Sequence, residues 1–484
     1  MLSLPNELIA LLLVRLSEGL EIDESSWPLR NSSRAWLPLA QTCHRVHEVA
    51  VSTQHLWRCI AVFTTGGFDT ALGRSGDLEI DVIFHRPHII PSAFMLLATH
   101  AARVRMLVVI EADRDTHSAL RFLLARPMPA LKTCQVHLVH RDILQHRHGE
   151  MRFAVDHALV PNLRTLQLGI LRLDWKSATI PRLRRLSLCN SFPRTFLTFD
   201  RFLDVLQSCA ALEYLKIVRS PPFMTPVPST ERTVALPNLR TLILESSDYT
   251  EVSALLAHLQ LSEHIDLDIN LDIDTDIEEE AVLTIPDILP IDPTRLPLLA
   301  SATSASLTSD SAVLIECIGP GRLQAFLNPA SATETDQGWH YTPSQAVAHF
   351  CALLAHAPLR ALELGLAWPY AGETCAASGM FAHVFQAFSA LEELAYGGGA
   401  NEASDRQLLG AFAGVALPRL RVLQLREWNG ELVPFLVQVL QMRMTRGLRL
   451  SQLDIQLAPG SEGVPDMGLR ALRQLVDGDV TVRY

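Results

Sequence analysis

The chain has 484 residues, of which 48% are apolar, 19% charged and 6% aromatic, and its mean hydropathy is slightly positive. This composition supplies a buried core and excludes a mainly disordered chain. The formal charge of −11, from 41 basic and 52 acidic residues, argues against binding to nucleic acid or to anionic membranes. Nine of the acids lie between Glu263 and Glu280, in a stretch without lysine or arginine.

The cysteines and the first residues indicate where the protein resides. No two of the eight cysteines form a CxxC motif, which predicts free, buried thiols in a reducing compartment. The longest apolar run near the start, Leu8 to Val14, is too short to span a bilayer and follows Glu7 instead of a basic segment. We therefore expect no signal peptide, transmembrane helix or lipid anchor, and a cytoplasmic or nuclear location.

Residues 1–62 are predicted to form a small helical module. Apolar residues recur with helical spacing in two stripes. The first stripe comprises Leu8, Ile9, Leu12 and Leu16, and the second comprises Leu39, Cys43, Val46 and Ala50. A polar insert, residues 17–34, separates them. So small a module has little core of its own, and we expect it to dock on its neighbour or on a partner chain.

The same segment resembles the F-box. It has an LPxE opening with apolar pairs, a helix with leucine and a cysteine near a basic residue (Arg45), and a closing Leu-Trp. Two departures are a long insert and His47 at a position where many F-boxes carry tryptophan. The resemblance implies docking to a Skp-type adaptor and, through it, to a cullin ubiquitin ligase. The implied adaptor contacts are Leu4, Pro5, Glu7, Leu8, Ile9, Leu12, Leu16, Leu39, Cys43, Leu56 and Trp57. The alternative is an ordinary pair of capping helices.

Beyond this module the chain repeats a phrase with apolar residues at positions 1, 4 and 6. Eight good copies begin at Leu163, Leu183, Leu212, Leu239, Leu359, Leu391, Leu420 and Leu450. Within each run the copies follow one another every 20 to 32 residues. The phrase ends as a short strand with one inward face, and the stretch after it has helical spacing.

The phrase resembles an irregular leucine-rich repeat. We therefore predict an α/β fold with a small N-terminal helical F-box, residues 1–62, and an irregular leucine-rich-repeat solenoid (a horseshoe), residues 63–484. The strand-like endings disfavour a helical HEAT-like array. Two ranges are predicted loop insertions: 219–233, which is rich in proline, and 286–343, which is rich in proline, alanine, serine and threonine. Between Ile265 and Ile277, apolar and acidic residues alternate as in one long strand.

Several patterns have the residue types of a catalytic or metal site but not the spacing. Asp272, Asp274 and Asp276 resemble the start of a calcium loop, but Ile277 and Leu283 replace the required glycine and glutamate. His140, Arg141 and Asp142 lack the rest of a kinase signature. The group Cys134, His137, His140, His146 and His148 fits no zinc pattern. We expect no catalysis, cofactor or metal.

The function predicted from these observations is the substrate-recognition subunit of a Skp-cullin-F-box ubiquitin ligase, with the repeats binding a target protein. The outward strand positions predicted to contact the target are Thr165, Gln167, Arg185, Ser187, Tyr214, Lys216, Glu245, Glu363, Glu393, Gln424 and Arg426. The chain has only three lysines, Lys132, Lys176 and Lys216, and would offer few acceptor amines to its own ligase. The alternatives are a ligase-independent interaction scaffold and an enzyme with an unrecognised site.

Overall fold

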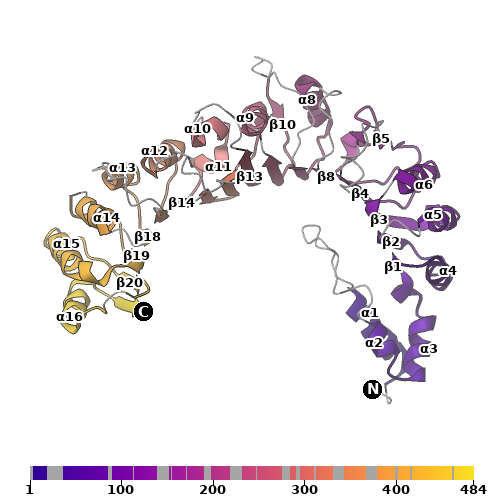
Figure 1. Cartoon of the computed structure of the whole chain (residues 1–484), viewed down its shortest axis with the longest axis horizontal. Helices are drawn as coiled ribbons and strands as arrows, with labels where there is room; N and C mark the ends of the chain where they lie inside the picture. Colours follow the sequence, from indigo (N-terminus) through magenta and orange to yellow (C-terminus); the bar gives the residue numbers. More distant parts are fainter. Residues whose placement is uncertain are drawn as a thin grey trace. The chain divides into compact units, whose positions relative to one another are not determined.

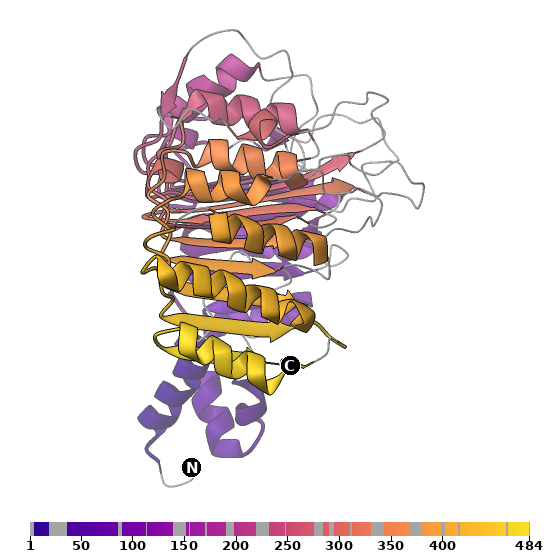
Figure 2. The same cartoon turned by 90° about the vertical axis from the view of Figure 1, so that its left-hand side faces the viewer.

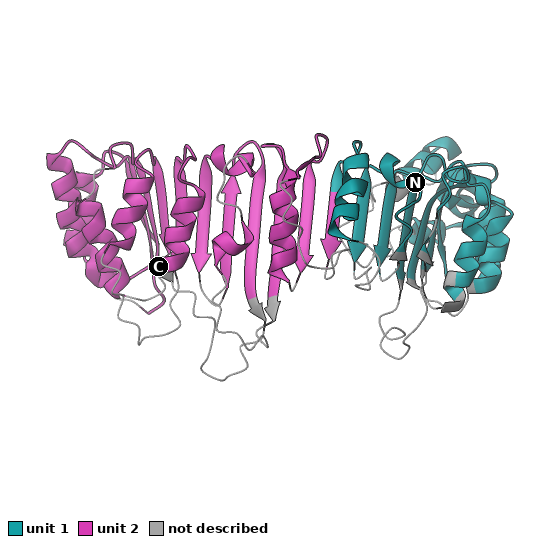
Figure 3. Ribbon diagram, turned by 90° about the horizontal axis from the view of Figure 1, so that it is seen from above, with its two compact units in different colours: residues 1–214, 222–224 teal, residues 215–221, 225–484 magenta. Residues whose placement is uncertain are grey.

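The chain forms two compact units (Figure 3). Unit 1 comprises residues 1–214 and 222–224, and unit 2 comprises residues 215–221 and 225–484. The structure is a computed structural model. It describes residues 4–18, 36–85, 90–112, 114–138, 152–153, 155–169, 172–189, 198–218, 232–246, 248–274, 284–289, 295–309, 312–330, 343–366, 379–397, 402–414, 417–460 and 463–483.

Unit 1 begins with helices and continues with alternating strands and helices (Figure 1). Its helices are α1 (Asn6–Glu18), α2 (Leu37–Ala40), α3 (His44–Ser52), η2 (Gln54–Trp57), α4 (Thr65–Arg74), α5 (Ile90–Ala98), η4 (Ala101–Arg103), α6 (Arg114–Leu124), η5 (Ile180–Arg182) and α8 (Phe199–Ser208). Its strands are β1 (Cys59–Val62), β2 (Ile80–His85), β3 (Val104–Ala112), β4 (Thr133–Leu138), β5 (Arg152–Phe153), β6 (Thr165–Gly169), β7 (Arg172–Leu173) and β8 (Arg185–Cys189).

Unit 2 repeats the strand-and-helix alternation. Its strands are β10 (Val234–Ala235), β11 (Thr241–Ser246), β12 (Leu259–Gln260), β13 (Asp266–Asp274), β14 (Ser304–Ser309), β15 (Val313–Ile318), β16 (Arg322–Ala330), β17 (Ala361–Leu366), β18 (Glu393–Gly397), β19 (Val422–Trp428), β20 (Gln452–Leu457) and β21 (Asp479–Arg483), with most of β9 (Tyr214–Val218). Its helices are α9 (Tyr249–His258), α10 (Ile285–Ile288), α11 (Pro297–Ala300), α12 (Pro343–Leu353), α13 (Met380–Ala387), α14 (Glu402–Gly414), η6 (Gly430–Leu432), α15 (Val433–Thr445) and α16 (Asp466–Leu475).

In unit 1 the strands β1, β2, β3, β4, β6 and β8 pair in that order, all parallel. Their apolar residues stand in register, so that Leu166 of β6 lies beside Leu186 of β8. On β2, Phe84 points to the helices, where its ring stacks on Phe94 of α5 at a centroid distance of 4.3 Å. The leucines of the phrases therefore form the contact between sheet and helices.

In unit 2 the strands pair in the order β11, β13, β16, β15, β14, β17, β18, β19, β20, β21. β15 runs antiparallel to both of its neighbours, and the other pairs in this series are parallel. The orange and yellow helices lie side by side over one face of these strands (Figure 2). The opposite face is not covered by described helices, and we call it the open face of unit 2.

The long alternating strand is confirmed for its described part. On β13, Leu267, Ile269 and Leu271 are buried, while Asp266, Asp268 and Asp272 are exposed. The period of two places the apolar residues toward the helices and the acids on the open face.

The predicted assembly, a small N-terminal helical F-box followed by a leucine-rich-repeat horseshoe, is wrong. Seventeen of the described strands make one mostly parallel sheet, and α1 to α3 belong to the same compact unit as β1 to β8. Strands occur at the leucine phrases, but they extend to five or more residues and pair along their length, which joins them into a broad sheet. The antiparallel strand β15 also interrupts the repeat.

The two ranges predicted as loop insertions differ in content. Most of residues 219–233 lies outside the described residues. The described part of 286–343 contains α11, β14, β15 and β16 and most of α10. Ser304, Ser306 and Thr308 of β14, which suggested a loop, are half-buried or exposed, while Ala305, Leu307 and Ser309 are buried.

Candidate functional site

The N-terminal helices share one small apolar core. It contains Ile9 and Leu13 of α1, Trp36, Ala40 of α2, Val46, Val49 and Ala50 of α3, and Leu56 of η2. Arg45 fixes the start of α1 against α3, because its Nε donates to Asn6 Oδ1 at 2.9 Å and its Nη2 to the Leu4 carbonyl at 2.6 Å. The inner stripe of α1 is therefore Ile9 and Leu13, spaced one helical turn apart.

The other side of α1 presents leucines to solvent. Leu8, Leu11, Leu12 and Leu16 are 46%, 52%, 50% and 44% exposed. We call these four side chains the leucine ridge. Scattered exposed leucines need no explanation, but four on one helix of thirteen residues form a contiguous apolar surface. Such a ridge is the kind of surface that another chain covers.

Trp57 connects these helices to the rest of unit 1. Its ring contacts Trp36 edge to face at a centroid distance of 5.3 Å, and the Arg74 guanidinium of α4 lies 4.5 Å above it. The indole Nε1 donates to the Ala50 carbonyl at 3.1 Å. Trp57 is thus half-buried and held on three sides.

The structure sorts the eleven predicted adaptor contacts into three groups. Pro5, Glu7, Leu8, Leu12 and Leu16 are exposed; Leu4, Leu39, Cys43 and Trp57 are half-buried; Ile9 and Leu56 are buried. Ile9 does not share a face with Leu8 and Leu12, contrary to the predicted stripe. Leu11 was missed, although its spacing of three from Leu8 gave a signal. His47 is exposed, and residues 19–35, which include most of the polar insert, lie outside the described residues.

The predicted target contacts stand on strand faces turned away from the helices, but their surroundings differ. In unit 1, Gln167 and Ser187 are adjacent in register and buried, and Thr165 and Arg185 are half-buried. The Arg185 guanidinium lies 4.6 Å above the Tyr214 ring. These side chains are held by their own neighbours.

In unit 2 the predicted target contacts include ion pairs on the open face. Lys216 Nζ lies 2.9 Å from Glu245 Oε1. Arg426 pairs with Glu363, and its Nη2 donates to Gln424 Oε1 at 3.4 Å. Glu393 is exposed on β18. This part of the predicted surface is accessible and charged.

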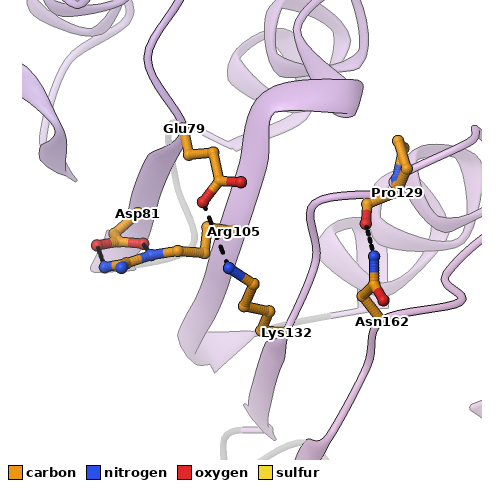
Figure 4. Close-up of polar contacts among 6 residues, drawn as sticks. All are labelled: Glu79, Asp81, Arg105, Pro129, Lys132 and Asn162. Atoms are coloured by element: carbon orange, nitrogen blue, oxygen red, sulfur yellow. Dashed lines mark hydrogen bonds and ion pairs between the residues drawn. The ribbon is translucent and has the colours of Figure 1, made fainter.

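Unit 1 also contains a group of charged residues at the starts of its strands (Figure 4). Arg105 donates through Nε to Asp81 Oδ1 at 2.8 Å and through Nη2 to Asp81 Oδ2. Asp81 is buried, and its hydrogen bond to Arg105 raises the pKa of the guanidinium. Beside it, Lys132 Nζ lies 3.6 Å from Glu79 Oε2. Every charge in this group has a partner of opposite sign.

Helices α14 and α15 of unit 2 each carry a buried charged side chain. Asp405 of α14 is 1% exposed, and burial raises the pKa of its carboxyl to about 7 against the opposing effect of Tyr396. Arg443 of α15 is 2% exposed, and burial lowers the pKa of its guanidinium to about 10. Its Nη2 donates to the Leu417 carbonyl at 3.1 Å, and its Cζ lies 4.2 Å from the centre of the Phe412 ring. Among the described residues no hydrogen bond or ion pair joins Asp405 to Arg443, and both side chains are closed to solvent.

The patterns with metal-ligand or kinase chemistry form no site among the described residues. No three His, Cys, Asp or Glu side chains of the described residues are grouped as metal ligands. Cys134 and His137 stand on opposite faces of β4, because they are three residues apart. His140, Arg141, Asp142, His146, His148 and Asp276 lie outside the described residues. Burial raises the pKa of the Cys134 thiol to about 12, which makes it unreactive.

Membrane spans and similar proteins were both searched for. No helix in the described ranges has both the length and the apolar character needed to cross a bilayer. Scanned against protein-family models, the chain matches none, and no curated protein is significantly similar to it.

Proposed function

We propose that the chain is the substrate-recognition subunit of a Skp-cullin ubiquitin ligase, in the cytoplasm or nucleus. In this proposal α1 binds the Skp-type adaptor, and the open face of unit 2 binds the target protein. The chain itself would catalyse nothing. It would accelerate ubiquitin transfer by holding target lysines near the charged enzyme, which raises their effective concentration.

The leucine ridge is the observation that carries the proposal. Ile9 and Leu13 already supply the contact of α1 with its own core, so Leu8, Leu11, Leu12 and Leu16 are not needed for internal packing. Burying each half-exposed leucine in an interface would contribute roughly 1 kcal/mol. The ridge coincides with the apolar positions of the LPxE segment, on which the resemblance to the F-box rests.

Co-purification with a Skp-type adaptor tests the proposal. The full-length chain should retain the adaptor, and the double variant Leu8→Asp/Leu12→Asp should reduce the affinity at least about a hundredfold, because two carboxylates would be buried at the contact. Met467→Asp is the matched control, since Met467 of α16 is 83% exposed and lies in unit 2. Adaptor binding that survives the double variant, or that is lost equally in the control, would contradict the proposal.

The second candidate is an interaction scaffold that never engages a ligase. The accessible charged open face favours a protein-binding role in either case. A chain that binds its target but retains no adaptor, in wild-type form, would favour the scaffold.

A further inference from the structure

The open face of unit 2 has a row of hydrogen-bond acceptors along its longest described strands. On β13 the row consists of Asp266, Asp268, Asn270 and Asp272, spaced two residues apart. In register on β11 and β16 lie Glu245 beside Asn270, Gln324 beside Asp268 and Asn328 beside Asp272. We call the four β13 side chains the acceptor row.

The basic side chains on the surrounding strands are already paired with glutamates. Lys216 lies 2.9 Å from Glu245, and Arg322 Nη2 lies 3.1 Å from Glu316 Oε1. Among the described residues, Asp266, Asp268 and Asp272 take part in no ion pair. The face therefore keeps three carboxylates that have no ion-pair partner among the described residues.

Asn328 Nδ2 donates to Asp272 Oδ1 at 3.3 Å, and two further observations concern the middle of the row. Asn270 Oδ1 is buried and accepts no hydrogen bond. Partial burial raises the pKa of the Asp268 carboxyl, and Glu245 raises it further against the weaker opposing effects of Lys216 and Arg322. An unsatisfied buried acceptor and a crowded carboxylate are both stabilised by a ligand that brings donors and positive charge.

We propose that the acceptor row binds a segment of the target protein rich in lysine and arginine. Ammonium and guanidinium groups are donors without acceptor capacity, and they match a surface of carboxylates and amide oxygens. The inference rests on the proposed function only in calling the bound protein a target for ubiquitination. The binding itself depends on the carboxylates and the amide oxygen of the acceptor row.

Binding of labelled peptides to the full-length chain tests this inference. The probe is a fluorescent peptide of alternating lysine, arginine, serine and glycine, and its partner has glutamate at every basic position. Anisotropy should show binding of the basic peptide alone, weakening as sodium chloride is raised. The isosteric variant Asp268→Asn/Asp272→Asn should weaken binding about threefold to tenfold.

The matched control removes the same charge from the helix side of unit 2. Glu431 and Asp466 are exposed on η6 and α16, so Glu431→Gln/Asp466→Asn should leave the affinity unchanged. Equal losses in both variants, or binding of the acidic peptide, would overturn the inference. Calcium chloride that displaces the peptide far better than sodium chloride of equal ionic strength would instead assign the row to a metal ion.

The adaptor-binding proposal and the acceptor-row proposal can be tested independently. The variant Asp268→Asn/Asp272→Asn should still co-purify with the adaptor, and Leu8→Asp/Leu12→Asp should still bind the peptide. If the row variant did not fold, the comparison of the two peptides and the salt dependence of the wild-type chain would still decide the question.

Discussion

The two units treat a buried charge in opposite ways. In unit 1, Asp81 is buried, but Arg105 covers it with two hydrogen bonds (Figure 4). In unit 2, Asp405 and Arg443 are both almost fully buried, and neither has an ion-pair partner among the described residues. The pKa values follow this difference: pairing raises that of Arg105, whereas burial raises that of Asp405 and lowers that of Arg443. The comparison teaches that burial alone does not fix the energetic role of a charge, because the partner decides it.

Replacing Asp405 should have the largest effect of the three charges, and this effect should depend on pH. Because its folded pKa, about 7, is above the model-peptide value of 3.8, the folded state holds a proton that the unfolded state has lost between these values. Stability is therefore lost as the pH rises from about 4 to about 7. Asp405→Asn should remove this loss, and its gain in the free energy of unfolding should be roughly 2 kcal/mol larger at pH 8 than at pH 5.

Urea unfolding at the two pH values measures this gain. Asp466→Asn is the control, since Asp466 is exposed on α16. An Asp405→Asn gain that is the same at both pH values would show that the carboxyl titrates normally.

Removing Asp81 should destabilise unit 1 by about 2 kcal/mol, because Arg105 would keep its charge and lose both acceptors. The exposed pair Glu363–Arg426 is the comparison, and Glu363→Gln should cost less than about 1 kcal/mol. Chemical denaturation of Asp81→Ala and Glu363→Gln provides the measurement. Equal losses would mean that the burial of Asp81 is irrelevant to the strength of its pair.

Replacing Arg443 should have the smallest effect on the free energy of unfolding. In contrast to the loss of Asp81, it should not destabilise the protein. Arg443→Met keeps an unbranched chain against Phe412 and removes a buried guanidinium whose Nε and Nη1 make no hydrogen bond within the described residues. We expect the variant to be as stable as the wild type or more stable by about 1 kcal/mol. A free energy of urea unfolding that is lower by about 2 kcal/mol or more would show that the guanidinium is satisfied in the fold.

The sequence predicted local structure better than assembly. The leucine phrases gave the strands at Leu166, Leu186 and Leu364, and the alternation gave β13, because a period of two is set by the backbone itself. Whether strands pair along their whole length depends on contacts between distant residues, and the solenoid was predicted without them. β14 was missed because its serine and threonine content resembles a loop, and β15, which contains neither residue, was included in the same predicted insertion.

The candidate site was predictable in part. The LPxE segment located α1, but a helix of nearly continuous leucine does not reveal which side faces inward, so Ile9 was placed on the wrong face. The acids of β13 were visible in the sequence. Their lack of partners was not, since it depends on Lys216 and Arg322 pairing with Glu245 and Glu316 from other strands.

The distribution of the three lysines gives the molecule a practical property. Lys132 and Lys176 are exposed in unit 1, whereas Lys216, in unit 2, is 28% exposed and held by Glu245. Amine-reactive dyes or biotin esters applied at limiting amounts would thus couple to side chains of unit 1 and spare the acceptor row. The wild-type protein can be immobilised through these amines with the open face of unit 2 left unmodified.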